Sequence, residues 1–145
     1  MPQTQSLTIT HEIFVPRELV FEVWTTADHL MCWYSPGEGY ERRAEIDLRP
    51  GGRMYFAWSK PGGESVEQEG VLVEVEPPVR VAYDVKIQDP ASTQPNRVSV
   101  NFVDLGGRTR IEIRQEGIES EDIRERQAER WQRFFAQLEN YLSSI

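Results

Sequence analysis

Residues 120–145, SEDIRERQAERWQRFFAQLENYLSSI, form the longest uninterrupted pattern in the chain. Ser120 is a good N-cap, and Glu121 and Asp122 follow in the first turn, where the helix dipole favours negative charge. Neither Gly nor Pro interrupts the next stretch, which predicts a helix of about 24 residues and roughly 36 Å. One face of this helix is apolar at the spacing of helical turns: Ile123, Trp131, Phe134, Phe135, Leu138, Tyr141, Leu142 and Ile145. A helix with so bulky an apolar face is expected to lie across a sheet.

The residues before this helix alternate between apolar and polar side chains, which predicts the strands of that sheet. The first strand is expected at Ser6–Val15. Pro16 then opens a short helix that reaches about Thr25, and a second helical turn follows at Asp28–Trp33. Six further strands are expected at Tyr40–Asp47, Arg53–Ser59, Val66–Val75, Val79–Ile87, Val98–Val103 and Thr109–Gln115.

The connections between these strands contain proline and glycine, as in RPGG at 49–52 and KPGG at 60–63. Such turns reverse the chain directly, so consecutive strands form hairpins and the sheet is antiparallel. We therefore predict a single α+β domain over residues 1–145, with residues 1–6 as a disordered start. It contains about seven strands, two short helices after the first strand, and the long C-terminal helix.

The composition is that of an ordinary soluble globular protein of 145 residues. The formal net charge of −8 argues against a nucleic-acid partner, because phosphate binding needs clustered Lys and Arg. No apolar run approaches the roughly 18 residues of a membrane helix, and Met1–Gln5 lacks the features of a signal peptide. Cys32 is the only cysteine, so no intrachain disulfide forms. A cytoplasmic location is expected.

Several short motifs are shared with a known family. The most specific is Asp47–Gly52, DLRPGG. The others run along the chain: Pro16-Arg17-Glu18, Val20-Phe21, Trp24, Leu30, Trp33, Gly70, Val75-Glu76-Pro77-Pro78, Thr109, Trp131 and Leu138. On these residues, from about residue 7 to 142, the chain resembles the activators of 90-kDa heat-shock protein ATPase homologue-like family. That family lies within the START and birch-pollen-allergen (SRPBCC) superfamily. Family members commonly have Gly where this chain has Arg130.

The resemblance implies a helix-grip fold, in which a strongly curved antiparallel sheet wraps around the C-terminal helix and leaves a hydrophobic cavity between them. It also implies the functions found in the family. These are binding of a small hydrophobic or amphipathic molecule, a role in stress response, a chaperone partner and, in a few members of the superfamily, enzymatic activity.

No catalytic motif is recognisable in the chain, and two histidines with one cysteine do not make a zinc site. No cofactor is implied. His29 and Cys32 are three residues apart, so they could form a thiol–imidazole pair, although a free cysteine is more often a small buried side chain.

His11 shares a strand face with Ile9 and Ile13, which are expected to face the long helix. It is either a core histidine bonded to a carbonyl or a polar contact in the cavity.

Strict alternation places Glu67 and Glu69 on the inward face with Val71, Val73 and Val75. Such carboxylates would need Arg partners or raised pKa values. The simpler alternative is that Gly70 marks a bulge that changes the register, or that the strand end protrudes into solvent.

We predict that the protein binds a small hydrophobic or amphipathic molecule between the sheet and the long helix. Aromatic side chains at these positions are usually core, but in a helix-grip cavity they also pack against a flat ligand. The expected ligand-binding residues are His11, Trp33, Met54, Phe56, Trp58, Glu69, Tyr83, Phe102, Trp131 and Phe135.

Two other functions stay open at this stage. A chaperone-linked interaction module would act through an exposed apolar patch over a filled core. An enzyme would use the same cavity, with His11 or Glu69 as acid–base. Exposed strand edges would also allow a homodimer.

Overall fold

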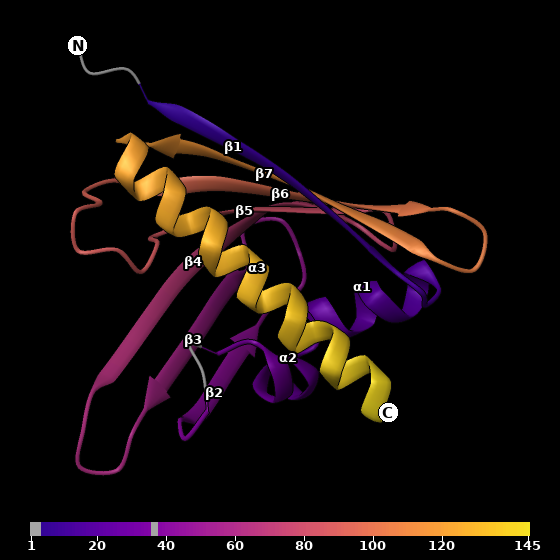
Figure 1. Cartoon of the computed structure of the whole chain (residues 1–145), viewed down its shortest axis with the longest axis horizontal. Helices are drawn as coiled ribbons and strands as arrows, with labels where there is room; N and C mark the ends of the chain where they lie inside the picture. Colours follow the sequence, from indigo (N-terminus) through magenta and orange to yellow (C-terminus); the bar gives the residue numbers. More distant parts are fainter. Residues whose placement is uncertain (1–3, 36–37) are drawn as a thin grey trace.

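The computed structural model describes residues 4–35 and 38–145 and contains seven strands and three helices within them (Figure 1). In chain order these are β1 (Gln5–Ile13), α1 (Arg17–Thr25), α2 (Ala27–Trp33), β2 (Glu41–Ile46), β3 (Arg53–Ser59), β4 (Ser65–Glu76), β5 (Arg80–Val85), β6 (Asn96–Asp104), β7 (Thr109–Ile118) and α3 (Glu121–Ser144). The predicted α+β class and element order are confirmed. Gln5 and Ser6 belong to β1, whereas residues 1–3 of the expected disordered start lie outside the described residues.

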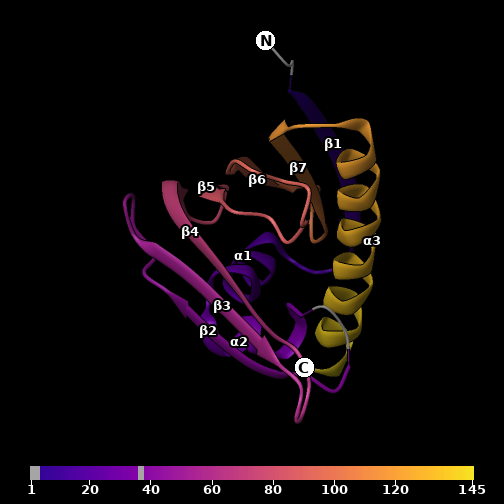
Figure 2. The same cartoon turned by 90° about the vertical axis from the view of Figure 1, so that its left-hand side faces the viewer.

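The strands form one antiparallel sheet in the order β1-β7-β6-β5-β4-β3-β2. Strands β2 to β7 are consecutive hairpins, as the turns predict, and β1 returns to pair with β7. The sheet curves, and α3 runs along its concave side (Figure 2). The short helices lie within the curve, where α2 contacts both β2 and α3. The edges of the sheet are β1 and β2, so a homodimer through an edge stays a prediction.

The long helix forms as its sequence predicts. The Ser120 side chain accepts a hydrogen bond from the Ile123 backbone N–H (3.2 Å), which caps the first turn. The apolar face of α3 is buried from Ile123 to Leu142, with Leu138 fully buried, whereas Ile145 after the helix is exposed. No helix of the described residues combines the length and the apolar character that a membrane crossing requires.

The first strand is shorter than predicted and ends at Ile13. Ile13 pairs with Thr109, the first residue of β7, and beyond it the hairpin turn at 105–108 offers no further partner. Phe14 is therefore free to turn outward and is 79% exposed.

The predicted faces of β4 are wrong over its first half. Gln68, Gly70 and Leu72 point into the core, whereas Glu67 and Glu69 are exposed. The pairing with β5 shifts between Leu72 and Glu74, so an extra residue in β4 changes the register. A bulge therefore explains the error, but it lies at position 73 and not at Gly70. Val71, which was expected to face inward, is 49% exposed.

Candidate functional site

Eight of the residues predicted to line a cavity, seven aromatic side chains and Met54, are buried. Trp33, Met54, Phe56, Trp58, Tyr83, Phe102, Trp131 and Phe135 are each 5% exposed or less. Trp24 connects several of them, because its ring lies 5.1 Å from Trp33, 5.7 Å from Phe102 and 6.3 Å from Trp131. Large side chains therefore occupy space that an open cavity would leave empty.

The polar ends of the three indoles among these residues are already used inside the protein. Trp33 Nε1 donates to the Val23 carbonyl (2.9 Å), and Trp58 Nε1 donates to the Tyr34 carbonyl (2.9 Å). Trp131 Nε1 donates to Gln115 Oε1 (2.8 Å). These tryptophans supply apolar surface, and their N–H groups hold the fold together.

Gln115 extends this last contact into a buried polar network beneath α3. Its Nε2 donates to Asn96 Oδ1 (2.8 Å) and to Gln127 Oε1 (3.2 Å), and all three side chains are buried. The network joins β6, β7 and α3 and satisfies the amides that burial would otherwise leave unpaired. The sequence pattern missed it because glutamine at a core-facing position looks like an interruption of the apolar face.

A second polar group lies between α3 and the β4 half of the sheet, and it is not fully satisfied. Tyr34 donates its hydroxyl to Gln68 Oε1 (3.2 Å), and its ring stacks on Phe134 with centroids 4.4 Å apart. The guanidinium of Arg130 lies over the other ring of this pair, 5.1 Å from the Phe134 centroid. Among the described residues, Arg130 Nη2 is shielded from water and has no hydrogen-bond partner.

The pKa directions in this group follow from burial. Burial lowers the pKa of Arg130, the nearby Arg133 lowers it further, and the neighbouring Tyr34 acts in the opposite sense. Burial raises the pKa of Tyr34, against an opposing effect of Arg130. Tyr83 is also buried, and its pKa is raised well above the ordinary value. The group thus combines a desolvated cation with phenols that stay protonated.

The segment at residues 86–95, which we call the β5–β6 loop, borders this group. Residues 65–69 of β4 extend beyond the end of β5. The loop runs beside them, since Lys86 N–H donates to the Glu69 carbonyl (3.3 Å) and Gln88 Nε2 to the Glu67 carbonyl (2.6 Å). Asp89 accepts from Arg126 Nε (2.7 Å) and Nη2 (3.2 Å), which fastens the loop to α3. A pocket of about 250 Å³ opens between the loop and α3. It is lined by Gln88, Asp89, Pro90, Arg126, Gln127, Glu129, Arg130 and Arg133.

His11 and Glu69, which were predicted to supply polar contacts in one cavity, lie in different parts of the molecule. His11 does face α3: its ring stacks on Phe135 (4.6 Å) and its Nε2 lies 2.7 Å from Glu139 Oε1. Glu69 is on the outer face of the sheet, where it pairs with Arg53. The structure does not bring His11 and Glu69 together.

The His29–Cys32 pair is not formed. Cys32 Sγ donates to the Asp28 carbonyl at 3.4 Å, while His29 Nδ1 lies 2.6 Å from the Tyr141 hydroxyl. The thiol is exposed, and His29 uses its Nδ1 on the phenol of α3. This geometry gives no activated thiol.

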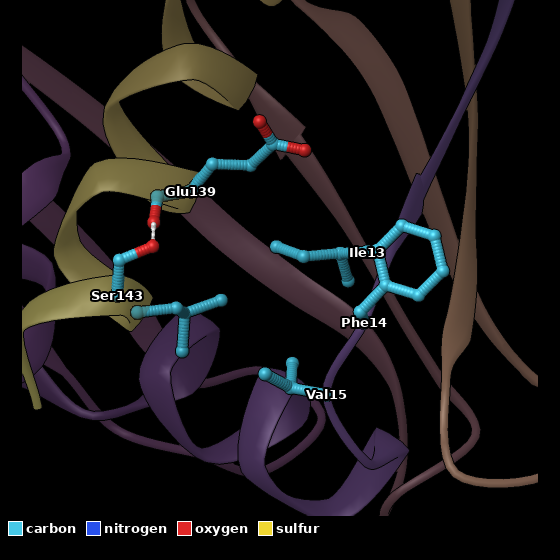
Figure 3. A pocket seen from close by; sticks show the side chains of 6 residues that line it. Ile13, Phe14, Val15, Glu139 and Ser143 are labelled. Carbon is cyan, nitrogen blue, oxygen red and sulfur yellow. Dashed lines mark hydrogen bonds between the residues drawn. The ribbon is translucent and has the colours of Figure 1, made fainter.

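An apolar groove lies on the opposite side of the molecule, between the end of β1 and the end of α3. Figure 3 shows Ile13 and Val15 pointing toward α3, with the ring of Phe14 on the other side of the strand. The groove has a volume of about 510 Å³, and Glu139, Leu142 and Ser143 complete its lining. Sequence analysis missed this surface because Phe14 and Val15 were read as part of a regular strand.

Comparison with known proteins agrees with this architecture. A structure from Chromobacterium violaceum matches with a TM-score of 0.80 at 23% identity, over 93% of this chain and 94% of that chain. A protein from Nitrosomonas europaea matches with a TM-score of 0.77 at 24% identity, over 96% and 94% of the two chains. Both likenesses concern the fold, and with the curved sheet and the long helix they define a helix-grip protein. No curated protein matches the chain.

The family itself follows from a match over most of the chain. The model of the family described as "Activator of Hsp90 ATPase homolog 1-like protein" matches residues 15–143, so the chain belongs to this family. An HSP90 activator from Plasmodium falciparum is similar in structure, with a TM-score of 0.74 and 25% identity over 95% of this chain and 96% of that one.

Proposed function

We propose that the protein binds a small amphipathic molecule between α3 and the β5–β6 loop, with the polar end of the molecule at Arg130. The observation that carries this proposal is the buried Arg130 Nη2 without a partner. An unpaired buried charge is costly, and a cation held beside a pocket in that state is typical of a binding site. Arg130 is one of the residues that line the pocket at the β5–β6 loop, so a ligand bound there lies next to it.

A cluster of aromatic side chains lies behind Arg130. Phe134 lies beneath the guanidinium, and Tyr34, which stacks on Phe134, also contacts Phe56 (4.6 Å) and Trp58 (5.7 Å). These contacts connect the pocket to the predicted aromatic wall. Ligand pockets of this kind combine apolar walls with a few well-placed polar groups.

Native mass spectrometry of protein purified from cells tests the proposal. We expect a co-purifying small molecule, and we expect hydrogen exchange to slow at 86–95 and 126–134 when it is bound. Glu129→Trp should abolish the adduct, because Glu129 is an exposed residue that lines the pocket. Glu125→Trp makes the same charge change one turn earlier on the exposed surface and should retain it. An adduct that persists in Glu129→Trp would place the ligand elsewhere, and no adduct in the parent protein would refute the proposal.

A second candidate function is favoured by the exposed groove at Phe14. Exposed aromatic side chains beside an apolar groove mark interaction sites, and one structural relative is named as an HSP90 activator. We propose that this groove contacts a chaperone of that class. The purified protein should then raise the ATPase rate of the 90-kDa heat-shock protein, and Phe14→Ser should remove the effect. Val71→Ser, an exposed apolar residue of the outer sheet face, is the control. If the parent protein does not change the ATPase rate of the 90-kDa heat-shock protein, this function is excluded.

A further inference from the structure

We infer that the ligand carries a single carboxylate, which binds Arg130 and Arg133 at the pocket beside the β5–β6 loop. The inference rests on the proposed binding function and adds the chemical class of the ligand.

Arg130 has one donor group, Nη2, without an acceptor. One face of its guanidinium is covered by the Phe134 ring, and Nη2 has no partner among the described residues. A guanidinium presents its N–H groups in a plane that matches the two oxygens of a carboxylate. Stacking on Phe134 fixes the guanidinium. Because Nη2 is shielded from water in the empty protein, a carboxylate in the pocket reaches it only when neighbouring side chains shift.

The charges of the pocket favour one negative charge on the ligand. Three arginines border it, at 126, 130 and 133, together with the carboxylates of Asp89 and Glu129. Both hydrogen bonds from arginine to the Asp89 carboxylate come from Arg126 and not from Arg130. One positive charge is therefore left over, and a monoanion neutralises it. A dianion would leave excess negative charge next to Glu129, which is unfavourable at a partly desolvated site.

The rest of the pocket favours an aromatic or aliphatic body on that carboxylate. Pro90 lines the pocket, together with the methylene groups of the arginine side chains. A free inorganic anion would leave these apolar groups uncovered. An amphipathic carboxylic acid covers it while its charged end meets the arginines.

Calorimetric titration with naphthalene-2-carboxylate and naphthalene-2-carboxamide tests the inference, because the two probes share shape and differ in charge. We expect the carboxylate to bind about tenfold more tightly, as one charge-assisted contact implies. Arg130→Gln should remove this preference, and Arg130→Lys should keep part of it. Arg114→Gln, an exposed position on β7, is the matched control and should bind as the parent does.

The outcomes separate this inference from the function on which it rests. Equal binding of both probes, unchanged in Arg130→Gln, would overturn the carboxylate while leaving the binding function intact. Binding of neither probe also overturns it, and the native mass spectra then decide the binding function independently. A carboxylate preference that Arg114→Gln also loses would show general electrostatic attraction and refute recognition by Arg130. Circular dichroism of each variant establishes that it is folded.

Discussion

Arg130 places a charge at the border of the apolar face of α3, one position before the buried Trp131. Family resemblance leads one to expect Gly there, and the arginine side chain fills the flank between Tyr34, Phe134 and Arg133. Its aliphatic part covers apolar surface while the guanidinium is desolvated without a carboxylate partner. Such a residue lowers the stability of the empty protein.

Arg130→Gln should therefore not destabilise the ligand-free protein. We expect the melting temperature to rise by about 2–4 °C, the shift that roughly 1 kcal/mol produces in a domain of this size. Differential scanning calorimetry of the parent and the variant measures it. Arg114→Gln should leave the melting temperature close to that of the parent. A clear fall in Arg130→Gln alone would show that Arg130 is satisfied in solution by groups within the protein.

At the scale of single elements, two turns with the same Pro-Gly-Gly sequence differ in their surroundings. In the turn at 49–52, Gly51 N–H donates to the Leu72 carbonyl (2.7 Å) and Leu72 N–H donates to the Gly52 carbonyl (2.9 Å). A Cβ added at Gly52 would lie 1.9 Å from the Asp47 carbonyl oxygen. At Gly63 the nearest atom would be Lys60 Cβ, at 3.3 Å. The first turn is thus locked to β4, and the second is an ordinary hairpin end.

Gly52→Ala should lower the free energy of unfolding by about 1–3 kcal/mol or more, because the backbone at Asp47 must move. Gly63→Ala should change it by less than about 1 kcal/mol, since the nearest atom, Lys60 Cβ, lies at 3.3 Å and must move only slightly. Urea unfolding followed by tryptophan fluorescence compares the two. Equal effects at both positions would contradict the packing that we describe for DLRPGG.

The β5–β6 loop is held by two carboxylates. Hydrogen bonds from Arg126 lower the pKa of Asp89, and hydrogen bonds from the Thr93 side chain and backbone lower the pKa of Glu119. A lowered pKa in the folded state stabilises the fold above the ordinary pKa of the group, and this stabilisation is lost as the pH falls through the lowered value.

The loop should accordingly stay closed at neutral pH and loosen below about pH 4. Amide chemical shifts of Thr93 and Gln94, recorded from pH 7 to pH 2, would follow the change. Asp89→Asn should loosen the Asp89 end of the loop at neutral pH and leave the Glu119 end attached. A loop unaltered between pH 5 and pH 2.5 would mean that these bonds do not hold it.

For the whole molecule, α3 packs against β1 and β7 at one edge of the sheet and against α2. Leu138 of α3 is fully buried, whereas Asn140 faces solvent. Leu138→Ala should cost about 2–5 kcal/mol of unfolding free energy. Asn140→Ala should change it by no more than about 0.5 kcal/mol. Chemical denaturation of both variants checks the difference, and a loss below 1 kcal/mol at Leu138 would mean that α3 is not packed as described.

The fold could be predicted from the sequence because its signals are local and mutually consistent. The periodicity of α3, the Ser120 cap and the Pro-Gly turns each specify one element, and together they admit few arrangements. The faces of β4 could not be predicted, because a bulge near position 73 changes the alternation without a marker in the sequence. Tyr34 and Gln68 were missed for a related reason: their contact depends on the curvature of the sheet, which no short stretch encodes.

The pairing of β1 with β7 brings residues 5–13 against residues 109–118. During synthesis the first strand therefore emerges long before its neighbour exists. At roughly 5–20 residues per second, about 5–20 s pass between the two. During that interval β1, which alternates apolar and polar residues, lacks its partner strand and can pair with another polypeptide or bind a chaperone. A nascent polypeptide halted before residue 109 should consequently leave its amino-terminal strand open to protease, and extension past residue 118 should protect it.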